Sequence, residues 1–311
     1  MNAAPEPNPS APTLIHNRIV GMTLLLLSQV MFGTTFAVNK LVLNQAMDPI
    51  LLAFARTTLG WLFLLPFFLM YRGSQRWTPA KWRLGLMVGM VSAPLAMMAE
   101  LTGTHFSTAS NASLILSIES LVAMVLSVWL LKEQPTRRMV AGLFIACMGM
   151  WFVLSRHISH VEFHFGSALF GDFLLFCAVF AWSFYTVLGK PLTEDVNPIY
   201  SVFFVLVFAS ITLGSISLVQ GTWGEFPKIS LQAWKGIVFL GVIGTGLPQL
   251  LYFQALKRLM ASTVSLSLTF QPVCGVFFAF LLLGEILSLS QAVGAVLVVF
   301  GIGYAVWVCR R

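Results

Sequence analysis

The sequence predicts an all-α integral membrane protein with ten transmembrane helices, arranged as two inverted repeats of five, with both termini in the cytoplasm. Three observations predict this fold: the composition, a series of long apolar runs, and a stretch that occurs twice. Of the 311 residues, 58% are hydrophobic and 9% are charged, whereas a soluble domain carries about 25% charged residues. The formal net charge of +7 would suggest nucleic-acid binding in a soluble protein, but the basic residues here lie between apolar runs. We therefore expect a lipid bilayer, and no nucleic acid, as the partner of this chain.

Ten apolar runs, each long enough to cross a bilayer as a helix, make up most of the chain. They cover residues 19–39, 50–70, 84–105, 109–131, 137–155, 167–189, 198–220, 234–256, 261–283 and 287–308. Residues 1–17 hold four prolines and no apolar period, so we expect a short disordered cytoplasmic tail and no signal peptide. Two domains of five helices each follow, over residues 18–156 and 166–309.

The duplication is clearest in a stretch of 25 residues that recurs 152 positions later. Residues 109–133 read ASNASLILSIESLVAMVLSVWLLKE, residues 261–285 read ASTVSLSLTFQPVCGVFFAFLLLGE, and eight positions are identical. Both copies carry a polar residue near the middle, Glu119 or Gln271, and both close on Leu-Leu-x-Glu. Because each half has an odd number of spans, the second half must cross the membrane in the opposite direction. Inverted repeats place a substrate site at the repeat interface near the midplane, which indicates a transporter.

The distribution of Lys and Arg predicts the orientation of the chain. The two tails and the loops on their side hold 13 of the 18 Lys and Arg residues, the loops on the other side hold 4, and Arg56 lies inside a span. Loops rich in Lys and Arg stay in the cytoplasm. Both termini are therefore expected in the cytoplasm, with the protein in the cell inner membrane.

Ionisable groups inside a membrane are costly and are functional candidates by default. Glu119 and Gln271 lie about ten residues into their spans, near the midplane. They could contact an ammonium group or, for Glu119, take up a proton; alternatively, they are hydrogen-bonded groups in helix packing. Glu100 and Arg56 lie near the outer ends of their spans at similar depth. We favour a structural ion pair between them over a gate or a substrate clamp.

A cavity for a flat apolar solute is expected to be lined by aromatic side chains with a few placed polar groups. Residues of these types lie at mid-span and near one outer end, and each could alternatively serve only helix packing. The cavity candidates are Trp182, Tyr185, Gln249, Tyr252, Gln254, Asn111 and Ser113.

Two spans at matching positions of the halves are interrupted by residues that disturb a helix. Pro94 interrupts span 84–105, and Gly244, Gly246 and Pro248 interrupt its counterpart, span 234–256. A further proline, Pro272, follows Gln271. Proline removes a backbone donor, and interrupted spans in corresponding positions are a pointer to a binding site. We interpret these residues as hinges; the alternative is that the bends only allow close packing.

No cofactor or metal is expected. The four cysteines lie in or at the end of apolar spans, where inert thiols are the rule. His157, His160 and His164 have only Glu162 near them, which does not favour a zinc site. The sequence has no phosphate-cradling loop, so no ATPase is implied. A membrane-embedded enzyme would need a nucleophile with a base, or metal ligands, at midplane depth. A channel stays an open alternative, and a monomer is favoured because two repeats complete one pathway.

Taken together, the ten spans, the duplication and the repeated Leu-Leu-x-Glu resemble the EamA-type carriers of the drug/metabolite transporter superfamily. The resemblance runs from Phe32-Gly33-Thr34-Thr35-Phe36 to the last glycine-rich span, and the chain is most similar to bacterial exporters of aromatic amino acids. It implies a secondary transporter that exports Trp, Phe, Tyr or similar small metabolites by alternating access. Export of amines, drugs or nucleobases is the alternative, and both proton-coupled and facilitated transport fit. Family members often have Trp at the position of Phe32, whereas here the Trp is in the second copy, as Trp182. We therefore expect the two halves to line the cavity unequally.

Overall fold

The computed structural model describes residues 11–43, 45, 47–71, 77–106, 115–158, 167–283 and 289–307, and within these ranges the regular structure is all helical. The α-helices are α1 (Ala11–Leu43), α2 (Pro49–Met70), α3 (Pro79–Leu86), α4 (Ala93–Phe106), α6 (Glu119–Leu131), α7 (Arg137–Ile158), α8 (Ser167–Thr193), α9 (Pro198–Val219), α10 (Leu231–Gly241), α11 (Leu247–Arg258), α12 (Ala261–Ser267), α13 (Phe270–Leu283) and α14 (Leu289–Trp307). A π-helix, Met87–Ser92, joins α3 to α4, and another, Val242–Gly246, joins α10 to α11. A 3₁₀-helix, Thr222–Lys228, follows α9.

The helices coincide with the described part of each apolar run. Within the described ranges, six helical stretches are long and apolar enough to cross a membrane: His16–Leu43, Pro49–Met70, Pro79–Phe106, Leu169–Thr193, Pro198–Val219 and Leu231–Arg258. Ile115–Leu131 and Leu289–Ala305 are shorter apolar helices. An all-helical protein with several apolar spans is therefore confirmed within the described residues. That the chain crosses the membrane ten times stays a prediction.

The first helix begins earlier than the sequence predicted. Residues 11–17, which we expected to be part of a disordered tail, belong to α1, whose first residue is Ala11. Pro12 is compatible with this start, because a proline in the first turn of a helix removes no intrahelical hydrogen bond. Residues 1–10 lie outside the described part of the chain.

Two helices at corresponding places in the halves begin with the same local chemistry. Asp48 accepts hydrogen bonds from the backbone N–H groups of Ile50 and Leu51 at the start of α2, and Pro49 follows it. At the start of α9, Asn197 accepts one from Ile199, and Pro198 follows it. An acidic or amide side chain satisfies N–H groups that have no intrahelical partner, and proline suits the first helical position.

The interruptions predicted in two spans are present as π-helices. In Met87–Ser92 the pattern shifts so that Ala93 donates to the carbonyl of Val88, and in Val242–Gly246 Leu247 donates to that of Val242. Short π-helices of this kind are frequent at functional sites. The third interruption differs from its prediction, because Pro272 lies in the first turn of α13 and the helix break precedes it, at Leu268–Thr269. Whether these places act as hinges stays a prediction.

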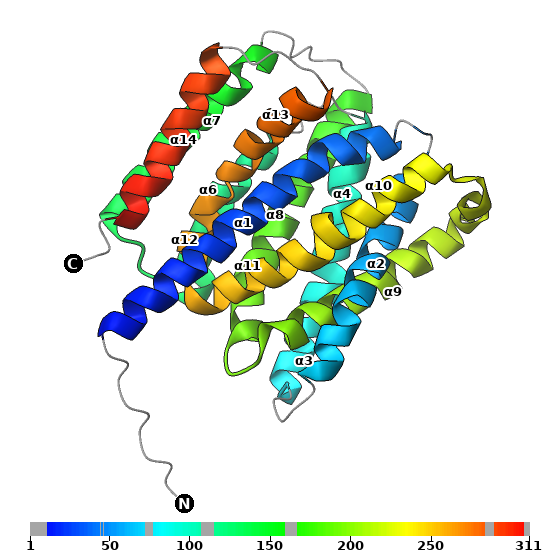
Figure 1. The fold of residues 1–311 in the computed structure, drawn as a ribbon, viewed down its shortest axis with the longest axis horizontal. Helices are drawn as coiled ribbons and strands as arrows, with labels where there is room; N and C mark the ends of the chain where they lie inside the picture. Colours follow the sequence, from blue (N-terminus) through cyan, green and yellow to red (C-terminus); the bar gives the residue numbers. More distant parts are fainter. Residues whose placement is uncertain are drawn as a thin grey trace, which may run out of the picture.

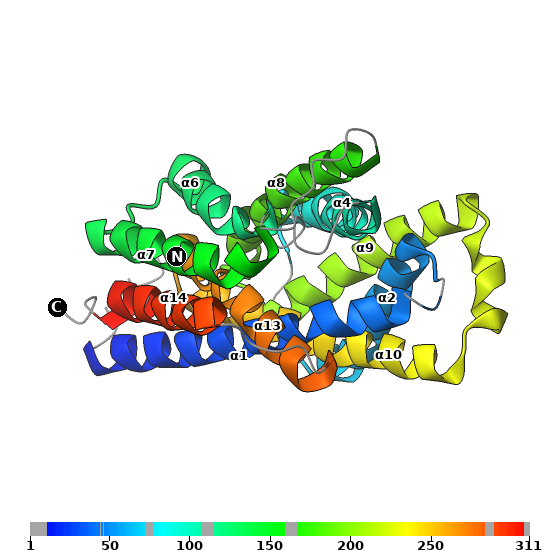
Figure 2. The same cartoon turned by 90° about the horizontal axis from the view of Figure 1, so that it is seen from above.

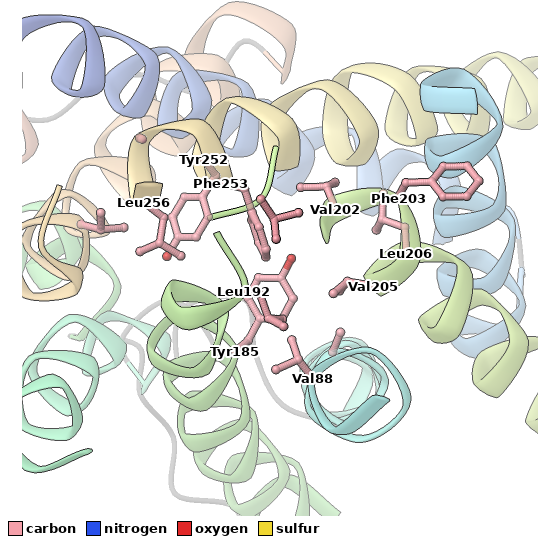
Figure 3. Packing of buried hydrophobic residues seen from close by; sticks show 14 of the residues in the cluster. Val88, Tyr185, Leu192, Val202, Phe203, Val205, Leu206, Tyr252, Phe253 and Leu256 are labelled. Carbon is pink, nitrogen blue, oxygen red and sulfur yellow. The ribbon is translucent and has the colours of Figure 1, made fainter. Parts of the chain in front are cut away.

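The helices pack in long pairs around a buried centre (Figures 1 and 2). Helix α1 runs beside α11 and α13, α2 packs on α9, α4 on α8, and α7 along α14 at one side of the bundle. The largest buried cluster lies where α8, α9 and α11 meet α3 and the π-helix after it, with Leu192, Val202 and Phe253 among its members (Figure 3). This cluster and its neighbours position the polar residues described next.

Candidate functional site

Polar and aromatic residues from helices of both halves meet in the middle of the bundle. The indole Nε1 of Trp182, on α8, donates to the Glu100 carboxylate, on α4, at 2.7 Å. The carboxylate of Glu119, at the start of α6, lies close enough to interact electrostatically with both Glu100 and Tyr252. Tyr252, on α11, also meets the edge of Phe32, on α1, with 6.3 Å between ring centroids. Four of the predicted residues are therefore brought together.

Glu119 is the residue of this group whose charge is left uncompensated. Its backbone carbonyl accepts a hydrogen bond from Ser183 at 3.3 Å, but within the described structure its carboxylate has no hydrogen-bond or ion-pair partner. The side chain is partly exposed, and the neighbouring charge of Glu100 is of the same sign. An unpaired carboxylate inside a protein is unfavourable, so this position favours the binding of a proton or of a cation.

Tyr185, Gln249 and Tyr252 belong to two separate buried hydrogen-bonded pairs, and Tyr252 lies near the Glu119 carboxylate. The Tyr185 hydroxyl donates to Gln249 Oε1 at 2.7 Å, and the hydroxyls of Tyr252 and Thr186 lie 2.7 Å apart. Both tyrosine rings pack against Phe253 at the edge of the large cluster, as Figure 3 shows. All three predicted residues are about 95% or more buried, so they hold the wall of the site in place more than they offer free groups to a ligand.

Arg56 has different partners from those that the sequence predicted. No ion pair joins it to Glu100 in the described structure, although the two charges attract each other. Arg56 Nε donates to Thr245 Oγ1 at 3.0 Å, Nη2 to the carbonyl oxygen of Gly244 at 3.3 Å, and Nη1 to Asn39 Oδ1 at 3.5 Å. Pro248 cannot donate to the carbonyl four residues before it, which is that of Gly244. The guanidinium therefore donates to a carbonyl that cannot accept from Pro248.

We expect Arg56→Met to destabilise the protein by about 1–3 kcal/mol, because the carbonyl of Gly244 and the hydroxyl of Thr245 lose their donor in a buried place. Thermal unfolding in detergent measures the effect. Arg258→Met is the matched control, because Arg258 is exposed and, within the described residues, its side chain bonds only to Gln254 of its own helix. Equal melting temperatures for the two variants would contradict this role of Arg56.

The other predicted site residues are placed as follows. Gln271, in the first turn of α13, is partly exposed, and its side chain has no hydrogen bond within the described structure. Gln254 does not join the central group: its amide oxygen accepts from Arg258 at 2.6 Å near the end of α11. Asn111 and Ser113 lie outside the described residues, as do His160 and His164. Within the described ranges no group of three His, Cys, Asp or Glu residues could hold a metal.

The sequence as a whole matches the model of the EamA-like transporter family twice, over residues 19–155 and 169–307. The chain belongs to this family. An uncharacterized transporter of Bacillus subtilis, YyaM, is 27% identical over 208 residues, which cover 67% of this chain and 68% of that protein. A probable amino-acid metabolite efflux pump of Salmonella typhimurium is 25% identical over 289 residues, covering 90% of this chain and 92% of the pump. Family and relatives thus indicate a multi-span membrane transporter and not an enzyme.

The fold of this chain is also found in a protein whose crystal structure is known. The two superpose with a TM-score of 0.74 at 18% sequence identity, over 96% of this chain and 98% of the other.

Two contacts of one EamA segment recur in the other at shifts of 150 and 152 residues. Ser183 contacts the carbonyl of Glu119, and its counterpart Gly33 lies against the carbonyl of Gln271. Trp182 contacts Glu100, and the counterpart pair is Phe32 with Tyr252. The two pairs differ in chemistry: Trp182 donates a hydrogen bond to a carboxylate, whereas Phe32 makes an aromatic contact with Tyr252. The centre is therefore unequal on its two sides.

Sequence reasoning missed the residues that hold the predicted ones. Thr186, Thr245 and Asn39 all bond to side chains of the site. Thr245 lies inside the Gly-Thr-Gly-Leu-Pro interruption, which was a usable signal. Thr186 and Asn39 carry no such signal, because a single Thr or Asn in a span most often bonds within its own helix or to a neighbour.

Proposed function

We propose that this EamA-family protein is a secondary transporter that exports aromatic amino acids or similar small metabolites across the cell inner membrane by alternating access. The observation that carries the proposal is the partly exposed Glu119 carboxylate, which is unpaired within the described structure and lies near Tyr252 and near Glu100, the residue that accepts from Trp182. A carboxylate can bind the ammonium group of an amino acid. Aromatic rings can bind the apolar side chain of the amino acid, and their faces also attract the ammonium group.

The proposed mechanism rests on two halves of five spans with opposite orientation. The double family match and the contacts that recur between the segments support this arrangement. The excess of Lys and Arg on the side of both termini supports a cytoplasmic location for them. One chain then contains a complete pathway, which favours a monomer that needs no ATPase subunit. Rocking one half on the other would open the centre to each side in turn.

The name of the Salmonella relative, which refers to amino-acid metabolites, supports this choice of substrate. A second candidate is an exporter of amines or cationic drugs. It is favoured by the charges at the centre, because the carboxylates of Glu100 and Glu119 lie near each other there and would attract a cation. The guanidinium of Arg56 is already bonded to other groups of the protein. In the first candidate the amide of Gln271, which has no side-chain bond within the described structure, would donate to the substrate carboxylate.

Uptake of labelled tryptophan into liposomes containing the pure protein tests the proposal, with and without a pH gradient. Saturable uptake that phenylalanine inhibits and choline does not is the expected result. Uptake no faster than into empty liposomes would contradict the aromatic amino-acid assignment. Inhibition by choline and simple amines, with none by phenylalanine, would replace it with the amine exporter.

A further inference from the structure

Glu133, the last residue of the first Leu-Leu-x-Glu sequence, caps helix α12 of the second EamA segment. Glu133 Oε1 accepts from the backbone N–H of Ala261 at 2.7 Å, and Oε2 accepts from that of Ser262 at 2.8 Å. These are the first two residues of α12, whose N–H groups have no partner within the helix. A carboxylate at a helix N-terminus makes charge-assisted bonds there. Both oxygens of one side chain thus join the first segment to the second.

Lys190 binds the other side of the turn between α11 and α12. Lys190 Nζ, on α8, donates to the carbonyls of Leu256 at 2.6 Å and Leu259 at 2.7 Å, where α11 ends. A cation is favourable at this end of a helix. The ammonium is also attracted by Glu133 and by the exposed Glu194. The turn between α11 and α12 is therefore held from both sides, by its carbonyls and by its N–H groups.

Helix α12 is built as a separate short element that could move. It has seven residues, all buried, and the turn at Leu268–Thr269 separates it from α13 beside Gln271. Within the part of the chain that the structure describes, the Ser262 hydroxyl has no hydrogen-bond partner, although the residue is 0% exposed. A buried polar group without a partner is unfavourable, which is consistent with a second arrangement in which this hydroxyl is satisfied.

We propose that Glu133 and Lys190 form a latch that holds α12 in place and keeps one end of the pathway closed, and that release of this latch opens that end. The inference rests on the proposed alternating access but not on the identity of the substrate. The latched end is that of both chain termini: Gly21 of α1 packs against Arg258 and Leu259, and Gly142 of α7 against Gly301 of α14. By the Lys and Arg count it is the cytoplasmic end.

The test is the labelling of a cysteine at Ser262 in a background whose four native cysteines are replaced. Ser262→Cys removes no hydrogen bond to any described residue, because the hydroxyl makes none there. A membrane-impermeant maleimide is applied from each side of oriented membrane vesicles, without substrate. We expect Glu133→Gln to raise the labelling rate about tenfold or more from the side of the termini, and not from the other side. An amide can accept from only one of the two N–H groups and presents a donor to the other.

Glu194→Gln is the matched control, because it removes a charge that also attracts Lys190 but that makes no side-chain bond to α12. Its labelling should equal that of the parent. Lys190→Gln is the second variant, and it should raise labelling from the same side as Glu133→Gln does; it decides the question if Glu133→Gln does not fold. Unchanged labelling, or an equal rise from both sides, would overturn the latch. A changed labelling rate without tryptophan uptake would leave the latch standing and contradict only the substrate.

Discussion

Replacing Glu119 by Gln is expected to reduce saturable tryptophan uptake by at least about tenfold and to abolish any response of that uptake to a pH gradient. The carboxylate has no bond or ion-pair partner within the described structure, so it is free to bind an ammonium group or a proton. A hydrogen bond to a charged group is worth about 1.5–3 kcal/mol, which corresponds to a tenfold to hundredfold change in binding. An amide of the same shape keeps the packing but carries no charge and cannot titrate. Uptake into liposomes at a series of tryptophan concentrations measures both effects.

Glu194→Gln is a suitable control for this substitution, because it makes the same chemical change at an exposed position outside the central group. Both variants should elute as the parent does and melt at similar temperatures. If Glu119→Gln transports tryptophan as the parent does and keeps the same pH response, neither the ammonium-binding role nor the proton role of Glu119 holds.

Replacing Gly142 by Val is expected to have the largest effect on stability. A Cβ atom at Gly142 would lie 2.6 Å from the carbonyl oxygen of Gly301 and 2.7 Å from the Cβ of Ala305. The reciprocal contact is equally short, because a Cβ at Gly301 would lie 2.6 Å from the carbonyl oxygen of Gly142. Helices α7 and α14 lie side by side (Figure 1) and touch at these glycines, so they would have to separate. Overpacking of this kind costs about 1–3 kcal/mol and often more for a branched side chain.

Gly303→Val, two residues from Gly301 on α14, provides the comparison. A Cβ at Gly303 would meet no atom within 4 Å, and a side chain there lowers the conformational entropy of the unfolded chain. Thermal unfolding in detergent should therefore show a large fall for Gly142→Val and little change or a slight rise for Gly303→Val. Similar melting temperatures for both would mean that α7 and α14 do not pack through these glycines.

Hydrophobicity and local chemistry predicted the helices well. Long apolar runs have no alternative to a helix in lipid, and Asp48 and Asn197, each before a proline, marked two helix starts that the structure has. The interruptions at Pro94 and Pro248 were also readable, because the loss of a backbone donor acts locally. Helix α1 extends over residues 11–17, where the proline-rich composition predicts disorder, because a first helical turn tolerates Pro12.

The partners of the polar residues could be predicted less well, because they depend on distances between helices. The similar depth of Arg56 and Glu100 suggested an ion pair, but depth says nothing about which backbone carbonyls compete for a guanidinium. In the structure Arg56 donates to the carbonyl of Gly244, and Glu100 accepts from the indole of Trp182 instead of from Arg56. Gln254 has the residue type and the position in a span that suit a cavity, yet its side chain accepts from Arg258 of its own helix.

The most direct test of alternating access is the reactivity of a cysteine at Gln271 from each side of the membrane. Gln271 is partly exposed next to the break between α12 and α13, at the proposed meeting point of the two halves. A membrane-impermeant maleimide is applied to oriented vesicles of the Gln271→Cys variant in the background without native cysteines, with and without tryptophan. The account predicts labelling from both sides, slowed by tryptophan in each case. Labelling from one side only, whether or not tryptophan is present, would contradict a central site that opens to both sides in turn.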